Sequence, residues 1–284
     1  MGIDVHALNL LRFANARHGA FGKVATLGRQ EIHVPKTKLQ RLLNTPPDYK
    51  PAHYCEDLLI QFFGASSVES FDVSDYEAAT HIVDMNQPLP EGLGGFNTVI
   101  DSGTVEHVFD VSQALLNVSN LCVPGGQIMH ILPANNFSGH GFWQFSPELF
   151  FALYSPQNGY QDTAVFLADT NDEKTWWEVR SLSEVRAPSN GQRPGANSKT
   201  PLYVLCRTKK TGAVPSRPYV QQDWEGGGAS APPGALLTFI RSRAWLFRIT
   251  SLLLRIFPVV KIASTGLNSR NPFLTRRDVA ELVR

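Results

Sequence analysis

The sequence has few cysteines, and their arrangement indicates neither a disulfide framework nor a zinc site. Cys55, Cys122 and Cys206 are its three cysteines; they are widely spaced, form no Cys-x-x-Cys motif and have no nearby histidine pair. An odd set of isolated thiols is typical of a reducing compartment. We therefore expect a cytoplasmic protein with no bound metal.

The sequence also lacks an excess of charge of either sign. Its 26 basic and 25 acidic residues give a formal net charge of +1. A balanced chain has no global field that would draw it to nucleic acid or to an anionic membrane, so such affinity requires a local patch. We expect no nucleic-acid partner.

The N-terminal residues show no targeting signal. The stretch MGIDVHALNLLRFANARHG lacks the basic region and long apolar run of a secretory leader, and His6 stands where a myristoylation signal requires Ser or Thr. We therefore expect neither export nor acylation from this end. With 284 residues, of which 43% are apolar, the chain can bury one sizeable core and a small appendage.

Short apolar runs alternate with helical patterns through most of the chain. This alternation is typical of a doubly wound, mostly parallel sheet with helices on its faces. Seven strands are predicted, at residues 23–28, 67–74, 79–86, 96–103, 127–135, 162–169 and 201–209. The last two have no helix between them, which favours an antiparallel hairpin at the edge of the sheet. Helices are predicted at 53–63, stopped by Gly64, and at 111–123, stopped by a Pro-Gly-Gly turn.

Three aspartates end consecutive predicted strands. They are Asp72, Asp84 and Asp101. In an open α/β sheet, ligands bind at the carboxyl ends of the strands, near the point at which the strand order reverses. Each aspartate alone is also explained as a helix cap or a turn former. Three of them on successive strands favour a ligand-binding rim.

The fourth predicted strand leads into the sequence DSGTVEHV, residues 101–108. We expect Thr104 to cap the next helix and Glu106 and His107 to lie in its first turn, facing the rim. This arrangement would place two titratable side chains directly beside Asp101.

The loop after the fifth predicted strand, PANNFSGHGFWQFSPELF, is rich in amides and aromatic rings. We predict that Asn135, Asn136, His140 and Trp143 bind substrate, because exposed aromatic residues are costly unless they cover something. The alternative is that the aromatic residues of this loop fill the core beneath it.

The order of SFDVSDYEAA, HIVDMNQPLP, FNTVIDSGTVEHV and LCVPGGQIMHILP resembles that of the class I S-adenosylmethionine-dependent methyltransferases over residues 20–210. The resemblance implies a Rossmann-like fold and S-adenosylmethionine as cofactor. It implies that Asp72 holds the ribose hydroxyls and that Asp84 meets the adenine amino group, with Met85 beside the ring. Asp101 and Ser102 would lie near the methionine part.

The first loop departs from the family pattern. Where the family has a glycine-rich motif after an acidic residue, this chain has TLGRQEIHVP, with Gly28 alone. Gly28 permits close approach of the backbone, and Arg29 is expected to supply contacts that glycine amides usually make. The alternative is a catalytically silent relative that acts as a binding or scaffolding partner.

The implied reaction is methyl transfer to an oxygen or a nitrogen of a small molecule or sugar. Such a transfer is an in-line displacement whose cost lies in alignment and in removal of the acceptor's proton. His107 and His140 are the candidate bases, and Asp101 would orient one of them or the substrate. For His107 a structural hydrogen bond under the cofactor is the alternative.

The chain changes character after residue 210. Residues 211–234 are a Gly/Pro-rich linker, and residues 235–284 are predicted to form an amphipathic helical appendage with Arg241, Arg248 and Arg255 near one face. Regular arginines exclude a membrane span. We expect this helix to pack on protein, either its own domain or a second copy in a homo-oligomer, in preference to a peripheral contact with a membrane.

Overall fold

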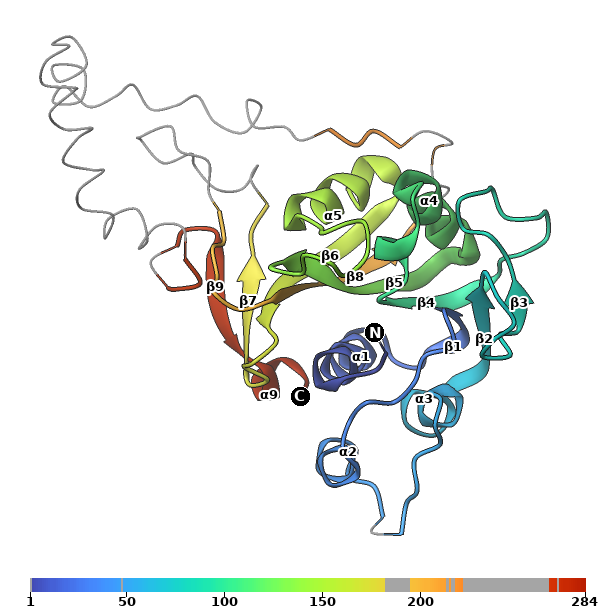
Figure 1. Ribbon diagram of the computed structural model, residues 1–284, viewed down its shortest axis with the longest axis horizontal. Helices are drawn as coiled ribbons and strands as arrows, with labels where there is room; N and C mark the ends of the chain where they lie inside the picture. Colours follow the sequence, from blue (N-terminus) through green and yellow to red (C-terminus); the bar gives the residue numbers. More distant parts are fainter. Residues whose placement is uncertain are drawn as a thin grey trace, which may run out of the picture.

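A twisted nine-stranded sheet forms the centre of the protein in the computed structural model (Figure 1). The structure describes residues 2–46, 48–181, 195–212, 215, 218–221, 266–269 and 271–284. In this part of the chain the strand order is β3-β2-β1-β4-β5-β8-β6-β7-β9. The mixed α/β class and the parallel core agree with the sequence-based prediction, whereas the number of strands is larger than the seven predicted.

One half of the sheet is parallel. Its strands are β1 (Gly22–Leu27), β2 (Ala65–Asp72), β3 (His81–Ile82), β4 (Phe96–Ser102) and the first part of β5 (Cys122–Asn135). The strand order runs outward from β1 to β3 and then returns to place β4 on the other side of β1. The carboxyl ends of these strands therefore meet at one edge, with the reversal of strand order between β1 and β4.

The other half is antiparallel and differs most from the prediction. Strand β8 (Leu202–Lys210) lies between β5 and β6 (Tyr160–Asp169), followed by β7 (Thr175–Val179) and β9 (Leu274–Asp278). The predicted antiparallel pair exists as β6 and β8, but it lies inside the sheet. The edge strand is β9, which pairs with β7. The sequence analysis missed both strands; β9 carries only one apolar residue in five.

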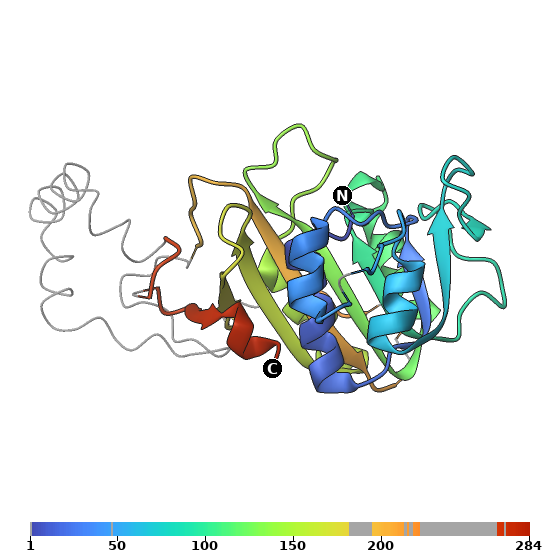
Figure 2. The same ribbon diagram turned by 90° about the horizontal axis from the view of Figure 1, so that it is seen from below.

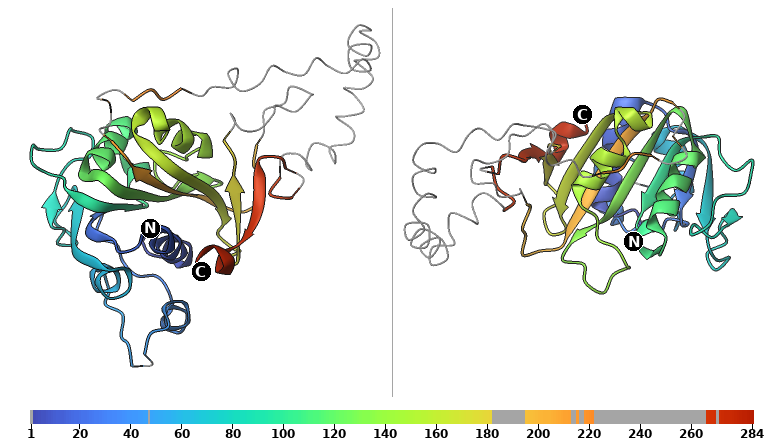
Figure 3. Two further views of the ribbon diagram at one scale, coloured as in Figure 1. Left: turned by 180° about the vertical axis from the view of Figure 1, so that it is seen from behind. Right: turned by 90° about the horizontal axis from the view of Figure 1, so that it is seen from above.

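Helices cover both faces of the sheet. On one face lie α1 (Val5–His18), α2 (Lys36–Leu43) and α3 (Glu56–Phe63), with α1 and α3 against the strands in Figure 2. On the opposite face, seen in Figure 3, lie α4 (Val111–Leu121) and α5 (Pro147–Leu153). The neighbours Val99 and Ile100 of β4 are buried in different apolar clusters, one on each side. This is the doubly wound arrangement that strand alternation requires.

Local signals explain where several helices begin and end. The Asp4 carboxylate accepts a 2.8 Å hydrogen bond from the Ala7 amide at the start of α1. Asp110 caps α4 in the same way, with 3.0 Å to the Gln113 amide. The predicted stop at Gly64 is confirmed: its φ of 65° is left-handed. The Pro-Gly-Gly turn differs from the prediction, because it lies within the span of β5, where the register with β4 shifts.

The predicted linker and helical tail fall mostly outside the described residues. Residues 222–265, including all three tail arginines, are among those that the structure does not describe. The end of the segment differs from the expected helix, because it forms strand β9 and the short helix α9 (Val279–Leu282). Arg277 of β9 pairs with Glu178 of β7 at 2.5 Å. Where the chain is described, it has no helix with the length and apolarity that a membrane crossing needs.

A buried lysine joins the two halves of the structure. The Lys210 ammonium, at the end of β8, donates 2.7 Å hydrogen bonds to the carbonyls of Ser119 and Cys122. These carbonyls lie at the end of α4, where backbone acceptors lack partners within the helix. Burial lowers the pKa of Lys210.

Replacing this lysine tests its contribution to stability. We expect Lys210→Met to lower the free energy of unfolding by about 1–3 kcal/mol, because two buried carbonyls lose a charged donor. The half-buried neighbour supplies the control: Lys209→Met should change stability by less than about 0.5 kcal/mol. Urea unfolding of the two variants measures the difference, and equal stabilities would show that the Lys210 contacts contribute nothing.

Candidate functional site

Three residues from separate strands meet at the reversal of strand order. Gly28 follows β1 with a φ of 70°, so a side chain there would be strained. A Cβ atom at this position would lie 3.3 Å from Thr104 Oγ1 and 3.9 Å from Asp72 Oδ2. Gly28, Asp72 and Thr104 thus surround one point, which we call the switch-point rim. The sequence analysis predicted the first two of these as cofactor-binding residues.

The rim is joined across β1 and β4 by hydrogen bonds. The Thr104 hydroxyl donates to the Leu27 carbonyl at 2.8 Å, and the Gln30 side chain donates to the same carbonyl. Asp72 Oδ1 accepts from the Ser74 amide at 3.0 Å, while Oδ2 lies on the side of Gly28. One carboxylate oxygen of Asp72 is therefore engaged by its own turn.

Arg29 fixes the first loop to its surroundings. Its guanidinium donates to Glu56 Oε1 at 2.7 Å and to the Glu77 carbonyl at 3.0 Å, and lies 4.1 Å from the centre of the Tyr54 ring. The hydrogen bond to Glu56 raises the pKa of Arg29. Arg29 thus ties the loop after β1 to α3 and to the turn after β2. A direct contact with cofactor remains a prediction.

Asp84 and Met85 lie beyond a strand much shorter than the predicted 79–86. Asp84 Oδ1 accepts from the Asn86 amide at 2.9 Å and from its side-chain amide at 2.7 Å. These bonds lower the pKa of Asp84. Met85 is buried, and its carbonyl accepts from the Asn117 side chain at 3.2 Å. Asp84 forms the turn that was the alternative explanation, and its role toward adenine remains a prediction.

Asp101 points into the protein from the end of β4. It is fully buried; Oδ1 accepts from the amides of Thr104 and Val105, at 3.1 and 3.4 Å. It therefore caps the 3-10 helix η1 (Val105–His107), a role that the sequence analysis gave to Thr104. Ser102, also buried, donates to the Gly2 carbonyl at 3.0 Å.

The histidine that Asp101 contacts is His130, which sequence reasoning missed. Asp101 Oδ2 lies 2.8 Å from His130 Nδ1, and His130 Nε2 lies 2.6 Å from the Tyr154 hydroxyl. Asp101 and His130 are register partners on parallel strands, which no local motif reveals. The expected contact of Asp101 with His107 or His140 is replaced by this buried chain of three side chains.

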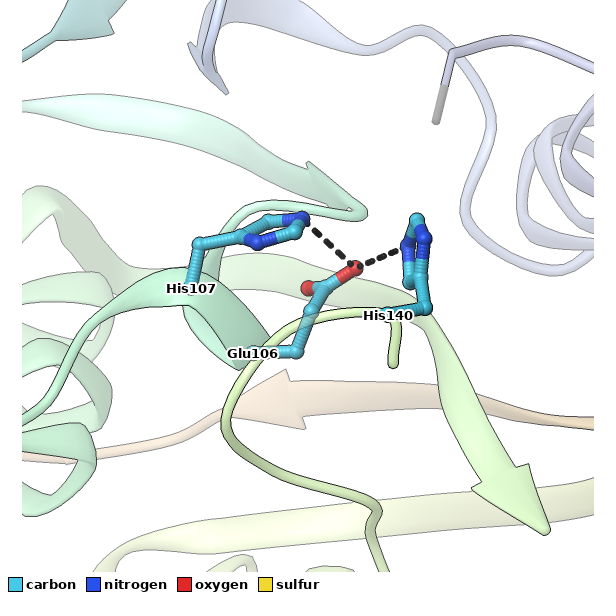
Figure 4. Close-up of side chains that lie close together, drawn as sticks. All are labelled: Glu106, His107 and His140. Atoms are coloured by element: carbon cyan, nitrogen blue, oxygen red, sulfur yellow. Dashed lines mark ion pairs between the residues drawn. The ribbon is translucent and has the colours of Figure 1, made fainter. Parts of the chain in front are cut away.

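Glu106, His107 and His140 form a separate group, which we call the Glu106 cluster (Figure 4). Glu106 Oε1 lies 3.7 Å from His107 Nε2 and 3.6 Å from His140 Nε2. The Glu106 side chain is 0% exposed, whereas the two histidines are 50% and 38% exposed. Within the described residues, neither carboxylate oxygen of Glu106 accepts a hydrogen bond, and His140 Nε2 has no hydrogen-bond partner.

The electrostatics of this cluster follow from burial. Burial raises the pKa of Glu106 to about 8, and the nearby charge of Asp101 acts in the same direction. Burial also lowers the pKa of His107, as does the proximity of His140. Burial thus disfavours the charged forms of Glu106 and His107.

The loop after β5 is held against η1 by its backbone. The amides of Phe142 and Trp143 donate to the Glu106 carbonyl at 2.7 and 3.2 Å. The Trp143 indole donates to the Val108 carbonyl at 2.9 Å. Phe145 fills the core, as the alternative explanation had it, whereas Phe142 and Trp143 remain exposed. The loop and the DSGTVEHV segment, predicted separately, are therefore one site.

Asn135 and Asn136 are engaged within the loop. Asn135 Oδ1 accepts from the Asn136 amide at 3.0 Å. The Asn136 side chain donates to the carbonyls of Ser198 and Thr200, both at 2.9 Å. These bonds anchor the loop to the segment before β8. Substrate binding by either asparagine remains a prediction.

A cavity lies elsewhere, between α5 and the strands at the antiparallel edge. Ser146, Leu167, Val179, Asn271 and Phe273 are among its lining residues. It contains none of the predicted site residues. The convergence of strand ends and buried polar groups, rather than this cavity, marks the candidate site.

No family model and no curated protein matches the chain. Among solved structures it is similar to a branched-chain polyamine synthase from Thermus thermophilus, in complex with N4-aminopropylspermidine and 5'-methylthioadenosine. The identity is 15% and the TM-score 0.40, over 80% of this chain and 61% of that one. The chain thus spans about three fifths of that protein's length.

Two further solved structures are similar to this chain. One is the 1,6-didemethyltoxoflavin-N1-methyltransferase from Burkholderia thailandensis with S-adenosylhomocysteine, at 12% identity and a TM-score of 0.40, over 73% of this chain and 79% of that one. The other is TehB from Haemophilus influenzae, at 11% identity and a TM-score of 0.41, over 70% and 61%. These likenesses concern the fold alone.

A pair of glycines tests how the Glu106 cluster is assembled. A Cβ atom at Gly141 would lie 2.8 Å from Glu106 Cγ and 2.9 Å from its carbonyl oxygen, whereas one at Gly139 meets nothing within 4 Å. Both glycines have positive φ, 72° and 87°, so both substitutions carry similar backbone strain. We expect Gly141→Ala to speed hydrogen exchange of the Phe142 amide at least about tenfold, and Gly139→Ala to change it little. Equal exchange in the two variants would contradict the close packing of this loop on Glu106.

Proposed function

We propose that the protein transfers a methyl group from S-adenosylmethionine to an oxygen or a nitrogen of a small molecule or sugar. The observation that carries this proposal is the switch-point rim, where Gly28, Asp72 and Thr104 surround one point at the reversal of strand order. Open α/β sheets bind their ligands at this place. The sequence motifs that resemble the class I methyltransferases lie at the same strand ends.

Asp72 would hold the cofactor's ribose. A carboxylate accepts hydrogen bonds from both hydroxyls of a vicinal diol, and Asp72 Oδ2 lies on the side of Gly28. Asp84 would accept from the adenine amino group, with Met85 beside the ring. Ser102 and Asp101, which are both buried, would support the methionine end, Asp101 through the turn whose amides it holds.

The Glu106 cluster would remove the acceptor's proton. In the transfer, a lone pair of the acceptor oxygen or nitrogen forms the new bond to the methyl carbon while the carbon–sulfur bond breaks, releasing S-adenosylhomocysteine. The acceptor must lose its proton during this displacement. The side chains of His140 and His107 are half-exposed beside the buried carboxylate, although the His140 Nε2 that faces it is buried.

A catalytically silent binding or scaffolding protein is the second candidate. The first loop favours it, because Arg29 is engaged by Glu56 and by the Glu77 carbonyl, and the Gln30 side chain bonds to the Leu27 carbonyl. The side chains of Arg29 and Gln30 are thus engaged within the protein, in the loop where the methyltransferase family has its glycine-rich motif. Calorimetric titration with S-adenosylmethionine and S-adenosylhomocysteine separates the two functions.

Removing the carboxylates at the strand ends tests the cofactor assignment. We expect Asp72→Ala and Asp84→Ala each to weaken binding of S-adenosylhomocysteine by roughly ten- to a hundredfold, about 1–3 kcal/mol, because a hydrogen-bond acceptor is lost. Asp75→Ala, in the exposed turn after β2, is the matched control and should bind like the wild type. Unchanged affinity in folded Asp72→Ala protein would sink the assignment.

Turnover tests the role of His140. With an acceptor found by screening hydroxyl and amine compounds, we expect His140→Ala to lower turnover by roughly 10²–10⁴-fold and to leave cofactor affinity intact. His53→Ala, another exposed histidine beside a carboxylate, should retain activity. Parallel loss of cofactor binding in His140→Ala would mean that the histidine holds the loop rather than serving the reaction.

A further inference from the structure

We propose that Glu106, His107 and His140 bind a divalent transition-metal ion such as Zn²⁺ or Mn²⁺. This differs from the expectation of no metal, which came from the cysteines alone. Binding of the ion stands apart from the proposed methyl transfer; only its use in that reaction rests on the proposed function.

The spacing of the three ligand atoms fits an ion between them. One carboxylate oxygen of Glu106 and one nitrogen from each histidine all lie within 4.8 Å of one another (Figure 4). The oxygen lies 3.7 and 3.6 Å from the two Nε2 atoms. Two ligand atoms that are each about 2.1 Å from a tetrahedral ion lie about 3.4 Å apart. Movements of a few tenths of an ångström would thus close the oxygen–nitrogen edges around an ion.

The buried carboxylate supplies an independent reason. Glu106 is fully buried, and neither of its oxygens accepts a hydrogen bond within the described part of the chain. His140 Nε2, which faces it, is likewise without a hydrogen-bond partner there. Burying a carboxylate without partners is costly, so such a group calls for a cation or a proton. A metal ion would neutralise the carboxylate and coordinate one of its oxygens together with His140 Nε2.

The backbone around the cluster is already ordered for binding. Asp101 caps η1, which carries Glu106 and His107, and the Glu106 carbonyl accepts two amides from the loop of His140. A side chain at Gly141 would collide with Glu106, so glycine allows this close approach. The ligands therefore come from two segments that the fold holds together before any ion arrives.

The ligand types select the metal. Two imidazoles and one carboxylate suit Zn²⁺, Mn²⁺, Fe²⁺ or Co²⁺, whereas Mg²⁺ and Ca²⁺ prefer oxygen ligands throughout. Three protein ligands leave coordination positions open, as in catalytic zinc sites. The side chains of His107 and His140 are half-exposed, although His140 Nε2 itself is buried. With an ion bound, the two histidines would be its ligands rather than bases, and in the proposed reaction an acceptor oxygen bound to the ion would lose its proton more readily.

Calorimetric titration of metal into tag-free, full-length protein treated with a chelator tests the inference. We expect the wild type to bind one Zn²⁺, and Mn²⁺ more weakly. Glu106→Gln and His107→Ala should each weaken Zn²⁺ binding by at least about tenfold, because each removes one of three ligands. His107 is half-exposed, so its variant is expected to fold even where Glu106→Gln does not.

The chain offers a matched control. Glu31 contacts His53 at 2.9 Å and His33 at 3.8 Å, but these histidines are 67% and 50% exposed and the carboxylate is only partly buried. The double variant His33→Ala/His53→Ala should bind Zn²⁺ like the wild type. If the wild type binds no Zn²⁺, or if folded His107→Ala binds it as tightly as the wild type does, the inference is wrong.

The outcomes distinguish this inference from the proposed function. Binding of S-adenosylhomocysteine without any binding of metal would overturn the metal site and leave the cofactor proposal standing. Metal binding that depends on Glu106 and His107, in a protein that binds no S-adenosylhomocysteine, would support the metal site and overturn the cofactor proposal.

Discussion

The carboxylate of Asp101 fixes the turn after β4, and both parts of the candidate site depend on that turn. One oxygen holds the amides at the start of η1, and the other holds His130 on the neighbouring strand. The same turn directs the Thr104 hydroxyl to the Leu27 carbonyl at the end of β1. The switch-point rim, through Thr104, and the Glu106 cluster therefore share one short segment of the chain.

The second constraint is the buried carboxylate of Glu106. The loop after β5 donates two amides to the backbone carbonyl of Glu106, and within the described residues the carboxylate accepts no hydrogen bond. A protein that needed this position only for packing would gain stability from an apolar side chain there. A buried carboxylate that accepts no hydrogen bond from the described residues, beside two half-exposed histidines, is typical of a functional site, where groups with shifted pKa values gather.

Much of the parallel half was predictable from the sequence, because apolar runs mark β1, β2, β4 and β5 and Gly64 ends α3. The antiparallel edge was not, since β9 is mostly polar and pairs with a strand about a hundred residues earlier. Within the site, the carboxylates at strand ends and the histidines were found from local motifs. The contact of Asp101 with His130 could not be found in this way, because it depends on the register between two strands. The expected contact of Asp101 with His107 or His140 was wrong for the same reason, and its orienting of a substrate stays a prediction.

If the Glu106 cluster serves the proposed methyl transfer, the bound cofactor and the metal ion must be neighbours, and nuclear magnetic resonance tests this most directly. S-adenosylmethionine carrying ¹³C in its transferable methyl group would be bound to the protein in the presence of Mn²⁺. We expect Mn²⁺ to broaden the methyl resonance of the bound cofactor strongly, and His107→Ala, which weakens the ion site, to remove most of this broadening. If both ligands bind and the resonance stays as sharp as without Mn²⁺, the central claim of one joint site is contradicted.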